Sequence, residues 1–338
     1  MSKYWQNTGM LARLLLPVSV LFGCVVQLRT QLYKSGLLKV HKFTVPVIVV
    51  GNISVGGTGK TPIVSALVKR CQLSGKKPGI VSRGYGAIPA KKPRMVDSNT
   101  AVELGGDEPL LLARETGVPI CICNDRSAAV KWLIANDEID VVISDDGMQH
   151  YAMNRDVELA VVDGQRLLGN GWLLPAGPLR EPAKRLSHVD IVAVQQANND
   201  TSISKPTKPS LVNWPVTGYF YLEIKTLQSL SDQHTIALDK LCGKQVHAVA
   251  GVGNPDRYFA SLRTAGLNVL EHAMPDHHRY TVDDIAFDDQ LPILITSKDA
   301  VKIRALNVDL TRIYEVCVAA KFDSNLDQAI DRVVATIK

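Results

Sequence analysis

Short apolar runs recur along the first part of the chain, and segments with helical spacing separate them. The runs lie at Val45–Val50, Gly79–Ser82, Pro119–Cys123, Val141–Ser144, Leu159–Val162 and Ile191–Val194. Wholly apolar runs that end in turn residues are typical of parallel strands buried between helices. The pattern therefore predicts an α/β domain built on a mostly parallel sheet with helices on both faces.

The pattern changes after residue 194 and resumes near residue 245. The stretch QQANNDTSISKPTKPS is polar and contains two prolines, which predicts an exposed loop. The next segment, GYFYLEIKTL, alternates enough to predict one or two strands of an extended ribbon. A chain of 338 residues is long enough for two domains. We predict an N-terminal helix over 1–35, a core domain over 36–215, a β-ribbon linker over 216–240 and a smaller α/β domain over 241–338.

The N-terminal segment from Leu11 to Leu28 is almost wholly apolar, with interruptions at Arg13, Pro17 and Gly23. Its uncharged part is shorter than the roughly 20 residues that a membrane-spanning helix needs. It also lacks the cleavage site of a signal peptide. Basic residues on both sides suit a helix that lies in the interface of an anionic membrane. A helix packed on its own domain is the alternative, and the apolar pattern alone leaves both open.

Composition narrows the class of protein without identifying it. The chain is 46% hydrophobic and 21% charged, as globular proteins are, and its formal net charge is +5. That mild positive charge suits an anionic ligand or a membrane surface, but the sequence lacks the dense basic stripe of a nucleic-acid-binding protein. The six cysteines are scattered and form no C-x-x-C pair, which favours structural thiols in a reduced cytosolic protein, and Cys121 and Cys123 alternate on a predicted buried strand, so we expect both in apolar surroundings.

Residues 50–62, VGNISVGGTGKTP, nearly match the phosphate-binding pattern G-x-x-x-x-G-K-[ST]. A predicted strand precedes the match and a predicted helix follows it, as a phosphate-binding loop requires. Lys60 would neutralise nucleotide phosphates and Thr61 would ligate Mg²⁺, while backbone N–H groups surround the phosphate oxygens. Ser54 replaces the first glycine, which the loop tolerates if the chain enters at negative φ. The predicted ATP-binding residues are Ser54, Val55, Gly56, Gly57, Thr58, Gly59, Lys60 and Thr61.

A phosphate-binding loop also needs carboxylates for its metal ion, and acidic residues occur in two further places. Asp145 and Asp146 follow the apolar run Val141–Ser144, at the edge where open α/β sheets bind ligands. They resemble a Walker B element, and a solvated Asp-Gly turn is the alternative. Asp107 and Glu108 begin a helix, where acids are favourable for structural reasons alone.

Three other short motifs each allow two interpretations. The segment MPDHHRY groups Asp276, His277 and His278, and an Asp next to a His suits proton transfer, whereas zinc lacks further ligands at the usual spacing. In SRGYG, Arg83 can meet phosphate and Tyr85 can stack on a ligand, or the segment is a surface turn. GVGNPDRYF lacks the third glycine of a dinucleotide fingerprint and predicts a tight turn into a helix.

Taken in order, the segments SVGGTGKTP, SRGYG, GGDEP, DDGMQH, LLPAGPLRE and PDHHRY closely resemble those of the tetraacyldisaccharide 4'-kinase family, the lipid A 4'-kinases of Gram-negative bacteria. The resemblance covers nearly the whole chain. It implies phosphorylation of the 4'-hydroxyl of a tetraacyldisaccharide 1-phosphate with ATP and Mg²⁺, forming lipid IVA. It also implies a P-loop domain joined by a short β-ribbon to a smaller α/β domain. The enzyme would lie peripherally on the cytoplasmic face of the inner membrane, in contact with membrane lipids through its N-terminal helix.

The same resemblance implies roles for individual residues. The family also begins its loop with serine, so Ser54 is a family trait. Asp107 matches the proposed catalytic base and His277 the histidine that assists it, with Lys60 on the phosphates. The remaining positions fall into two groups. Those around magnesium are Thr61, Glu108, Asp145 and Asp146, and those associated with the acceptor or its phosphates are Arg83, Tyr85, Gln149, His150 and Arg180.

Two other classes of protein share the loop. Membrane-recruited ATPase switches of the partitioning type carry a second lysine five residues before the loop lysine, and this chain has Val55 there. A soluble P-loop ligase or kinase of a cofactor pathway would not explain the apolar segment 11–28. The sequence predicts no particular protein partner.

Overall fold

The sheet runs through the whole molecule. The computed structural model describes residues 3–196 and 214–337. Within them, thirteen strands form one mixed sheet in the order β11-β10-β12-β13-β8-β7-β6-β1-β5-β2-β4-β3, and β9 pairs with β8. All pairs are parallel except β3–β4, β8–β13 and β8–β9. The mostly parallel sheet predicted from the apolar runs is confirmed.

Each of the six apolar runs forms a strand within a residue or two of the expected bounds. The strands of the first half are β1 (Val47–Gly51), β2 (Pro78–Ser82), β3 (Arg94–Val96), β4 (Ile120–Ile122), β5 (Val141–Asp145), β6 (Val157–Asp163) and β7 (Ile191–Gln195). Those of the second half are β8 (Gly218–Ser229), β9 (Thr235–Ile236), β10 (Gln245–Ala250), β11 (Asn268–Ala273), β12 (Ile293–Thr296) and β13 (Ile313–Phe322).

Helices cover both faces of the first half, which is why its strands are apolar throughout. Ile48 and Val50 of β1 pack in one core cluster, whereas Val47 and Val49 pack in another on the opposite face. The helices are α1 (Met10–Leu14), α2 (Leu16–Lys34), α3 (Lys60–Leu73), α4 (Val102–Gly105), α5 (Asp107–Thr116), α6 (Arg126–Asn136), α7 (Pro255–Thr264), α8 (Ser297–Ile303) and α9 (Ser324–Thr336). Short 3-10 helices span Lys3–Gln6, Ala183–His188 and Leu238–Leu241. Helices α3, α5 and α9 contribute to the first cluster, and α6 contributes to the second.

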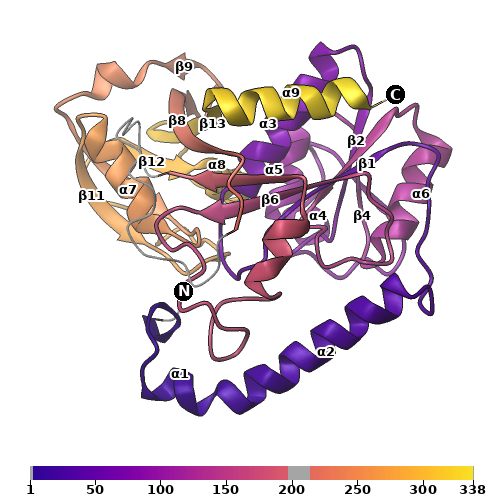
Figure 1. The fold of residues 1–338 in the computed structure, drawn as a ribbon. Coiled ribbons are helices and arrows are strands. Elements are labelled where there is room, and N and C mark those ends of the chain that lie inside the picture. The colour runs from indigo at the N-terminus through magenta and orange to yellow at the C-terminus, as the bar shows by residue number, and fades with distance from the viewer. Residues whose placement is uncertain (1–2, 197–213, 338) are drawn as a thin grey trace.

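A long antiparallel pair joins the two halves. Strand β8, formed by the segment predicted as a ribbon, pairs in parallel with β7 and antiparallel with β13, and the register shifts between Cys317 and Val318. From β13 the chain enters α9, which crosses back over the first half (Figure 1) and pairs Asp327 with Arg70 of α3. The predicted domain boundaries stay predictions, but the last helix shares the core of the first half.

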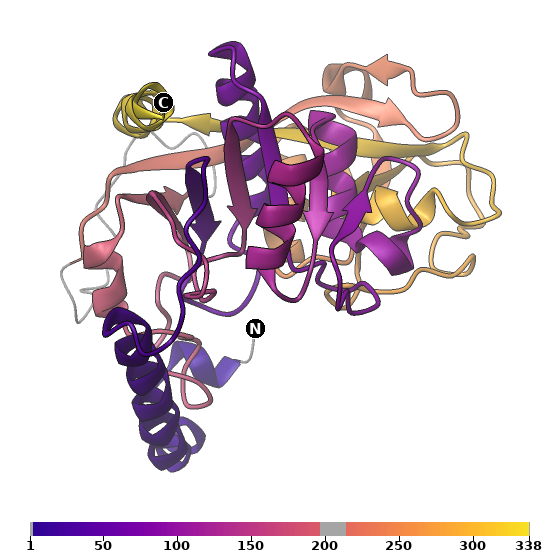
Figure 2. The same cartoon turned by 90° about the vertical axis from the view of Figure 1, so that its right-hand side faces the viewer.

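Helices α1 and α2 lie apart from the sheet in both views (Figures 1 and 2). Helix α2 contacts the loop before residue 180 through two small residues. Ser19 donates to the Leu173 carbonyl at 2.9 Å, and Gly23 lies so close to Leu173 that a Cβ at this position would be 2.8 Å from its side chain. Most apolar side chains of α1 and α2 point into solvent instead, including Leu14, Val18, Val20, Leu21, Val25 and Leu28. No helix in the described part of the chain is long and apolar enough to cross a membrane.

Two further predictions concern the polar stretch after residue 194 and the cysteines. The polar stretch predicted as an exposed loop lies, after its first two residues, outside the described residues. The cysteines that are described have free thiols, and Cys121 and Cys123 are buried on β4 and just after it, as predicted. Burial raises the pKa of the Cys121 thiol to about 12, so it stays protonated and unreactive.

Candidate active site

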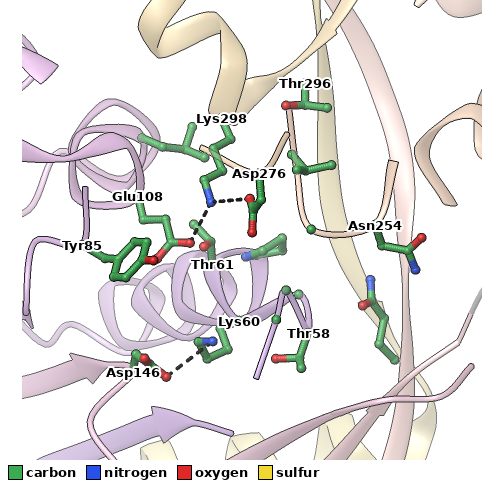
Figure 3. Close-up of a pocket in the computed structure, with 18 of the residues that line it drawn as sticks. Thr58, Lys60, Thr61, Tyr85, Glu108, Asp146, Asn254, Asp276, Thr296 and Lys298 are labelled. Carbon is green, nitrogen blue, oxygen red and sulfur yellow. Dashed lines mark hydrogen bonds and ion pairs between the residues drawn. The ribbon is translucent and has the colours of Figure 1, made fainter. Parts of the chain in front are cut away.

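A cavity of about 780 Å³ lies where the carboxyl ends of strands from both halves meet. Segments that follow β1, β2 and β5 line it on one side, and segments that follow β10 and β12 line it on the other (Figure 3). Open parallel sheets place their ligand sites at this edge. The residues predicted to bind ATP, magnesium or acceptor all line the cavity, except Ser54 and Asp145, which are buried next to it, as is the predicted base Asp107.

The segment 54–61 has the backbone of a phosphate-binding loop. Gly56 and Gly59 have φ angles of 102° and 77°, in the left-handed region that favours glycine, and α3 begins at Lys60. Ser54 is not among the described residues with positive φ, so serine is unstrained at the loop entrance. The Val55 N–H donates to the Pro178 carbonyl at 2.9 Å, which fixes that entrance to the LLPAGPL segment.

Lys60 extends from this loop toward an acidic neighbour. Its Nζ lies 3.4 Å from Oδ1 of Asp146 and 3.4 Å from Oδ1 of Asn52. Arg180 contacts the same Asp146 carboxylate at 3.1 Å. Burial opposes ionisation of Asp146, but Lys60, Arg180 and Arg126 together hold the pKa of its carboxyl at about 2. Asp146 is therefore ionised, and it holds the lysine in the cavity.

Asp145, the other acid of the pair, has a contrasting environment. It is almost fully buried at the end of β5, and neither carboxylate oxygen has a hydrogen-bond partner among the described residues. Burial, and after it the charge of Glu108, raises the pKa of Asp145 to about 7. A buried carboxylate without donors is costly unless a cation approaches it.

These groups suit Mg²⁺ better than a metal held by the protein alone. The described residues contain no cluster of three or more His, Cys, Asp or Glu side chains that could hold an ion. Mg²⁺ usually takes one or two carboxylates and completes its shell with water and phosphate oxygens. Asp145 and the Thr61 hydroxyl fit that pattern, whereas Asp146 is already paired with two cations.

The second half of the chain contributes a histidine to the first half's acidic motif. His277 Nδ1 lies 2.9 Å from Oδ2 of Asp107, and the Glu108 N–H donates to Oδ1 of Asp107 at 3.1 Å. Burial opposes ionisation of Asp107, but His277, Lys298 and Lys302 outweigh this effect and lower the pKa of its carboxyl. The Tyr85 ring lies 4.6 Å from the His277 ring. The structure thus brings together Tyr85, Asp107 and His277, which three separate motifs supply.

Glycines permit the backbone contacts that assemble these motifs. Gly106 has a φ of 79°, and a Cβ there would lie 2.6 Å from the Tyr85 carbonyl oxygen. A Cβ at Gly253 would lie 3.0 Å from the Gly57 nitrogen. The GVGNP segment is a tight turn into α7, as predicted, and it also packs directly on the phosphate-binding loop.

The five predicted acceptor residues line the same cavity. Arg83 and Tyr85 are exposed, and Tyr85 has 61% of its surface accessible. Gln149 donates to the Asn52 carbonyl at 3.0 Å and to Glu181 at 2.7 Å. Burial, reinforced by Arg126, lowers the pKa of His150 to about 4, so its ring is neutral near pH 7.

Several polar residues of the cavity carry no sequence motif, and sequence reasoning missed them. Arg126 is buried beside the acidic pair and donates to the Asp146 carbonyl at 2.8 Å. Arg257 of α7 reaches across to Asp163 at 2.8 Å. Lys298 of α8 contacts Glu108 at 3.1 Å. Asn52, Arg126 and Lys298 each come within a few residues of the end of a strand, and that position was an available signal. Arg257 lies in the GVGNPDRYF segment, where only a turn into a helix was predicted.

Comparisons with known proteins agree with the motifs. The family model described as tetraacyldisaccharide-1-P 4'-kinase (LpxK) matches residues 11–335. A tetraacyldisaccharide 4'-kinase of Xanthomonas oryzae pv. oryzae is 47% identical over 87% of this chain and 83% of its own length. That of Stenotrophomonas maltophilia is 44% identical over 90% of this chain and 88% of its own.

Among solved structures, the LpxK of Aquifex aeolicus in complex with ATP is similar with a TM-score of 0.77 and 29% identity, covering 96% of this chain and 99% of that one. The similarity therefore includes the P-loop half, the second half and the ribbon between them. Motif order, fold and sequence identity agree over almost the full length, and we conclude that the chain belongs to the tetraacyldisaccharide-1-P 4'-kinase family.

Proposed function

We propose that this kinase transfers the γ-phosphoryl group of ATP to the 4'-hydroxyl of tetraacyldisaccharide 1-phosphate, forming lipid IVA, in the cavity between its two halves. The observation that carries the proposal is the contact of His277 with Asp107, next to the cavity that Lys60 and Thr61 line. The ATP complex of the Aquifex aeolicus relative supports ATP as the donor.

Phosphoryl transfer requires positioned oxygens and neutralised charge more than covalent chemistry by the protein. In a phosphate-binding loop the backbone N–H groups surround the phosphate oxygens at the start of the next helix, which is α3 in this chain, and Lys60 would add a positive charge. Bound Mg²⁺ would supply further neutralisation of the phosphate charge. Thr61, Asp145, Asp146 and Glu108 would hold it, with Asp145 as the principal ligand, because its carboxylate oxygens have no hydrogen-bond partner among the described residues.

Asp107 is the proposed base for the sugar hydroxyl. Its lowered pKa keeps the carboxylate ionised and able to accept a proton at neutral pH. A weak base suffices in a loose transition state, because the attacking oxygen becomes acidic only as its bond to phosphorus forms. His277 assists by holding Oδ2 of Asp107 at 2.9 Å.

The acceptor's sugar would bind near Arg83, Tyr85, Gln149, His150 and Arg180, while its acyl chains stay in the membrane. Helices α1 and α2 expose apolar side chains, and Arg13, Arg29 and Lys34 lie on the same helices. Such a helix binds in the interface of an anionic bilayer. These features support attachment to a membrane surface, and the resemblance to the family implies that the surface is the cytoplasmic face of the inner membrane.

The test is an assay of labelled ATP with tetraacyldisaccharide 1-phosphate in mixed micelles. The native chain should form a phosphorylated lipid, and Lys60→Ala should form none. Lys69→Ala is the matched control, because Lys69 is exposed on the same helix and does not line the cavity. Hydrolysis of ATP by the native chain without any lipid product would refute the proposed acceptor.

A further inference from the structure

We propose that Lys298 is a positioning residue for phosphoryl transfer, which fixes the tautomer of His277 and, through His277, the orientation of the Asp107 carboxylate. The proposal rests on the proposed function above and adds a residue to it. No motif or resemblance drew attention to this lysine.

Lys298 belongs to the second half of the chain but points into the first. It is the second residue of α8, just after the carboxyl end of β12, and its side chain is only 16% exposed. Figure 3 shows its amine between Glu108 and Asp276, on the far side of Thr61 from Lys60. The cavity thus contains two lysines, one at the P-loop and one at the acidic motif.

The Lys298 amine contacts members of both halves. Its Nζ lies 3.1 Å from Oε1 of Glu108 and 3.8 Å from Oδ2 of Asp107, both at the start of α5. It also lies 3.3 Å from Nε2 of His277 and 3.7 Å from Oδ1 of Asp276. Every other group in this set is acidic or is the imidazole, so the amine is the cation that the cluster shares.

The contact with His277 determines which ring nitrogen carries the hydrogen. An ammonium group only donates, so Nε2 of His277 must accept from it. A neutral imidazole with an accepting Nε2 carries its hydrogen on Nδ1. That Nδ1–H then donates to Asp107 at 2.9 Å. Lys298 at Nε2 and Asp107 at Nδ1 therefore favour the same tautomer, in which the ring donates to the base.

The same arrangement distinguishes two roles for His277. Because Nδ1 already carries a hydrogen, it cannot receive a proton from Asp107, so the ring orients the carboxylate and does not relay its proton. Without Lys298, the nearest group to Nε2 with an acidic oxygen is Asp276, at 3.8 Å. A carboxylate there competes with Asp107 for the ring hydrogen, so part of the population carries the hydrogen on Nε2 and no longer donates to Asp107 from Nδ1.

Lys302 provides a matched control on the same helix. Its Nζ lies 4.0 Å from Oδ2 of Asp107, close to the 3.8 Å of Lys298, so it places a similar charge near the base. Its closest acidic partner is Asp299, at 3.1 Å. Loss of Lys302 removes a positive charge near Asp107 and leaves the lysine contact with His277 intact.

The experiment is a double-mutant cycle in the micellar kinase assay. Lys298→Met should lower kcat about 10- to 100-fold, as loss of a supporting hydrogen bond does at other sites, with KM for ATP little changed. Lys298→Arg should recover most of the rate, and Lys302→Met should lose less than Lys298→Met. The double variant Lys298→Met/His277→Ala should be no slower than His277→Ala alone. Multiplying losses would overturn the proposal, since Lys298 would then act without His277.

A second readout does not depend on turnover. Nitrogen NMR of isotope-labelled histidine should show His277 with its hydrogen on Nδ1, the signal being assigned by its absence in His277→Gln. In Lys298→Met the fraction of rings with the hydrogen on Nδ1 should fall, and an unchanged tautomer overturns the proposal. If Lys298→Met fails to fold, the test uses Lys298→Gln, which keeps an N–H donor and should keep the hydrogen on Nδ1. A changed tautomer in Lys298→Gln would count against the proposal. A native chain without kinase activity would refute the proposed function and leave the tautomer result standing.

Discussion

Three leucines on the N-terminal helices make a quantitative prediction about membrane binding. Leu21 and Leu28 lie seven residues apart on α2, two helical turns, and therefore share one face, and Leu14 is the last residue of α1, seven residues before Leu21. Their side chains are 73%, 66% and 61% exposed, respectively. We call these three residues the leucine stripe. Replacing all three by glutamine keeps size and helix propensity and removes the apolar surface.

The expected loss follows from the exposed area. Full burial of a leucine side chain is worth about 1.5–3 kcal/mol, so burying the exposed two-thirds of each contributes about 1–2 kcal/mol. Three such residues contribute about 3 kcal/mol at the lower end. Because each 1.4 kcal/mol is a factor of ten, the triple variant should bind bilayers at least about 100-fold more weakly.

Flotation with vesicles that contain anionic lipid measures this directly. The control is Leu73→Gln, since Leu73 is 84% exposed on α3, outside the N-terminal helices, and should not affect flotation. Circular dichroism should show equal helix content in all variants. If the triple variant floats with vesicles as fully as the native chain, the leucine stripe does not attach the enzyme to the membrane.

Three further predictions concern the site. Asp145→Asn should become more stable relative to the native chain as pH rises from 4 to 8, because the pKa of Asp145 is about 7 in the folded state and near 3.8 in the unfolded state. The stability difference between variant and native chain, measured by urea unfolding, should therefore change by up to about 4 kcal/mol between these pH values. A stability difference that does not change with pH would refute the cost of ionising Asp145. Gly106→Ala should lose about 1–3 kcal/mol of stability and most activity, because its φ is 79° and its Cβ meets a carbonyl oxygen. The control Gly117→Ala, at φ 65° in open space, should keep its activity. Gly253→Ala should weaken ATP binding in calorimetry, because its Cβ would lie 3.0 Å from the Gly57 nitrogen; unaltered affinity would show that the turn does not affect the loop.

The local part of this structure could be predicted from the sequence. A buried parallel strand has a short-range pattern, and the phosphate-binding loop and the Asp145–Asp146 pair each follow such a strand directly. Their place at one edge of the sheet then follows from the rule that parallel strands share a ligand-binding edge. The apolar N-terminal helices were equally apparent, because the signal is a continuous segment.

The long-range part could not be predicted in this way. Nothing in the segment 313–322 indicates that it pairs with β8, because lateral strand order depends on the rest of the fold. His277 meets Asp107 across a separation of 170 residues, and Lys298 meets Glu108 across 190. Resemblance to the family supplied the histidine, whereas the lysine became apparent only once the fold placed α8 over α5.

The antiparallel pair of β8 and β13 has a mechanical consequence. It is hydrogen-bonded to β7 of the first half and to β12 of the second, so the backbone ladder is unbroken from one half to the other. Sliding one half along the other would break this ladder, whereas bending or twisting it keeps the hydrogen bonds. The register shift between Cys317 and Val318 is a local weak point, and Val316 and Val318 line the cavity. Relative motion of the halves that keeps this ladder is therefore bending or twisting, which changes the width of the cavity between them.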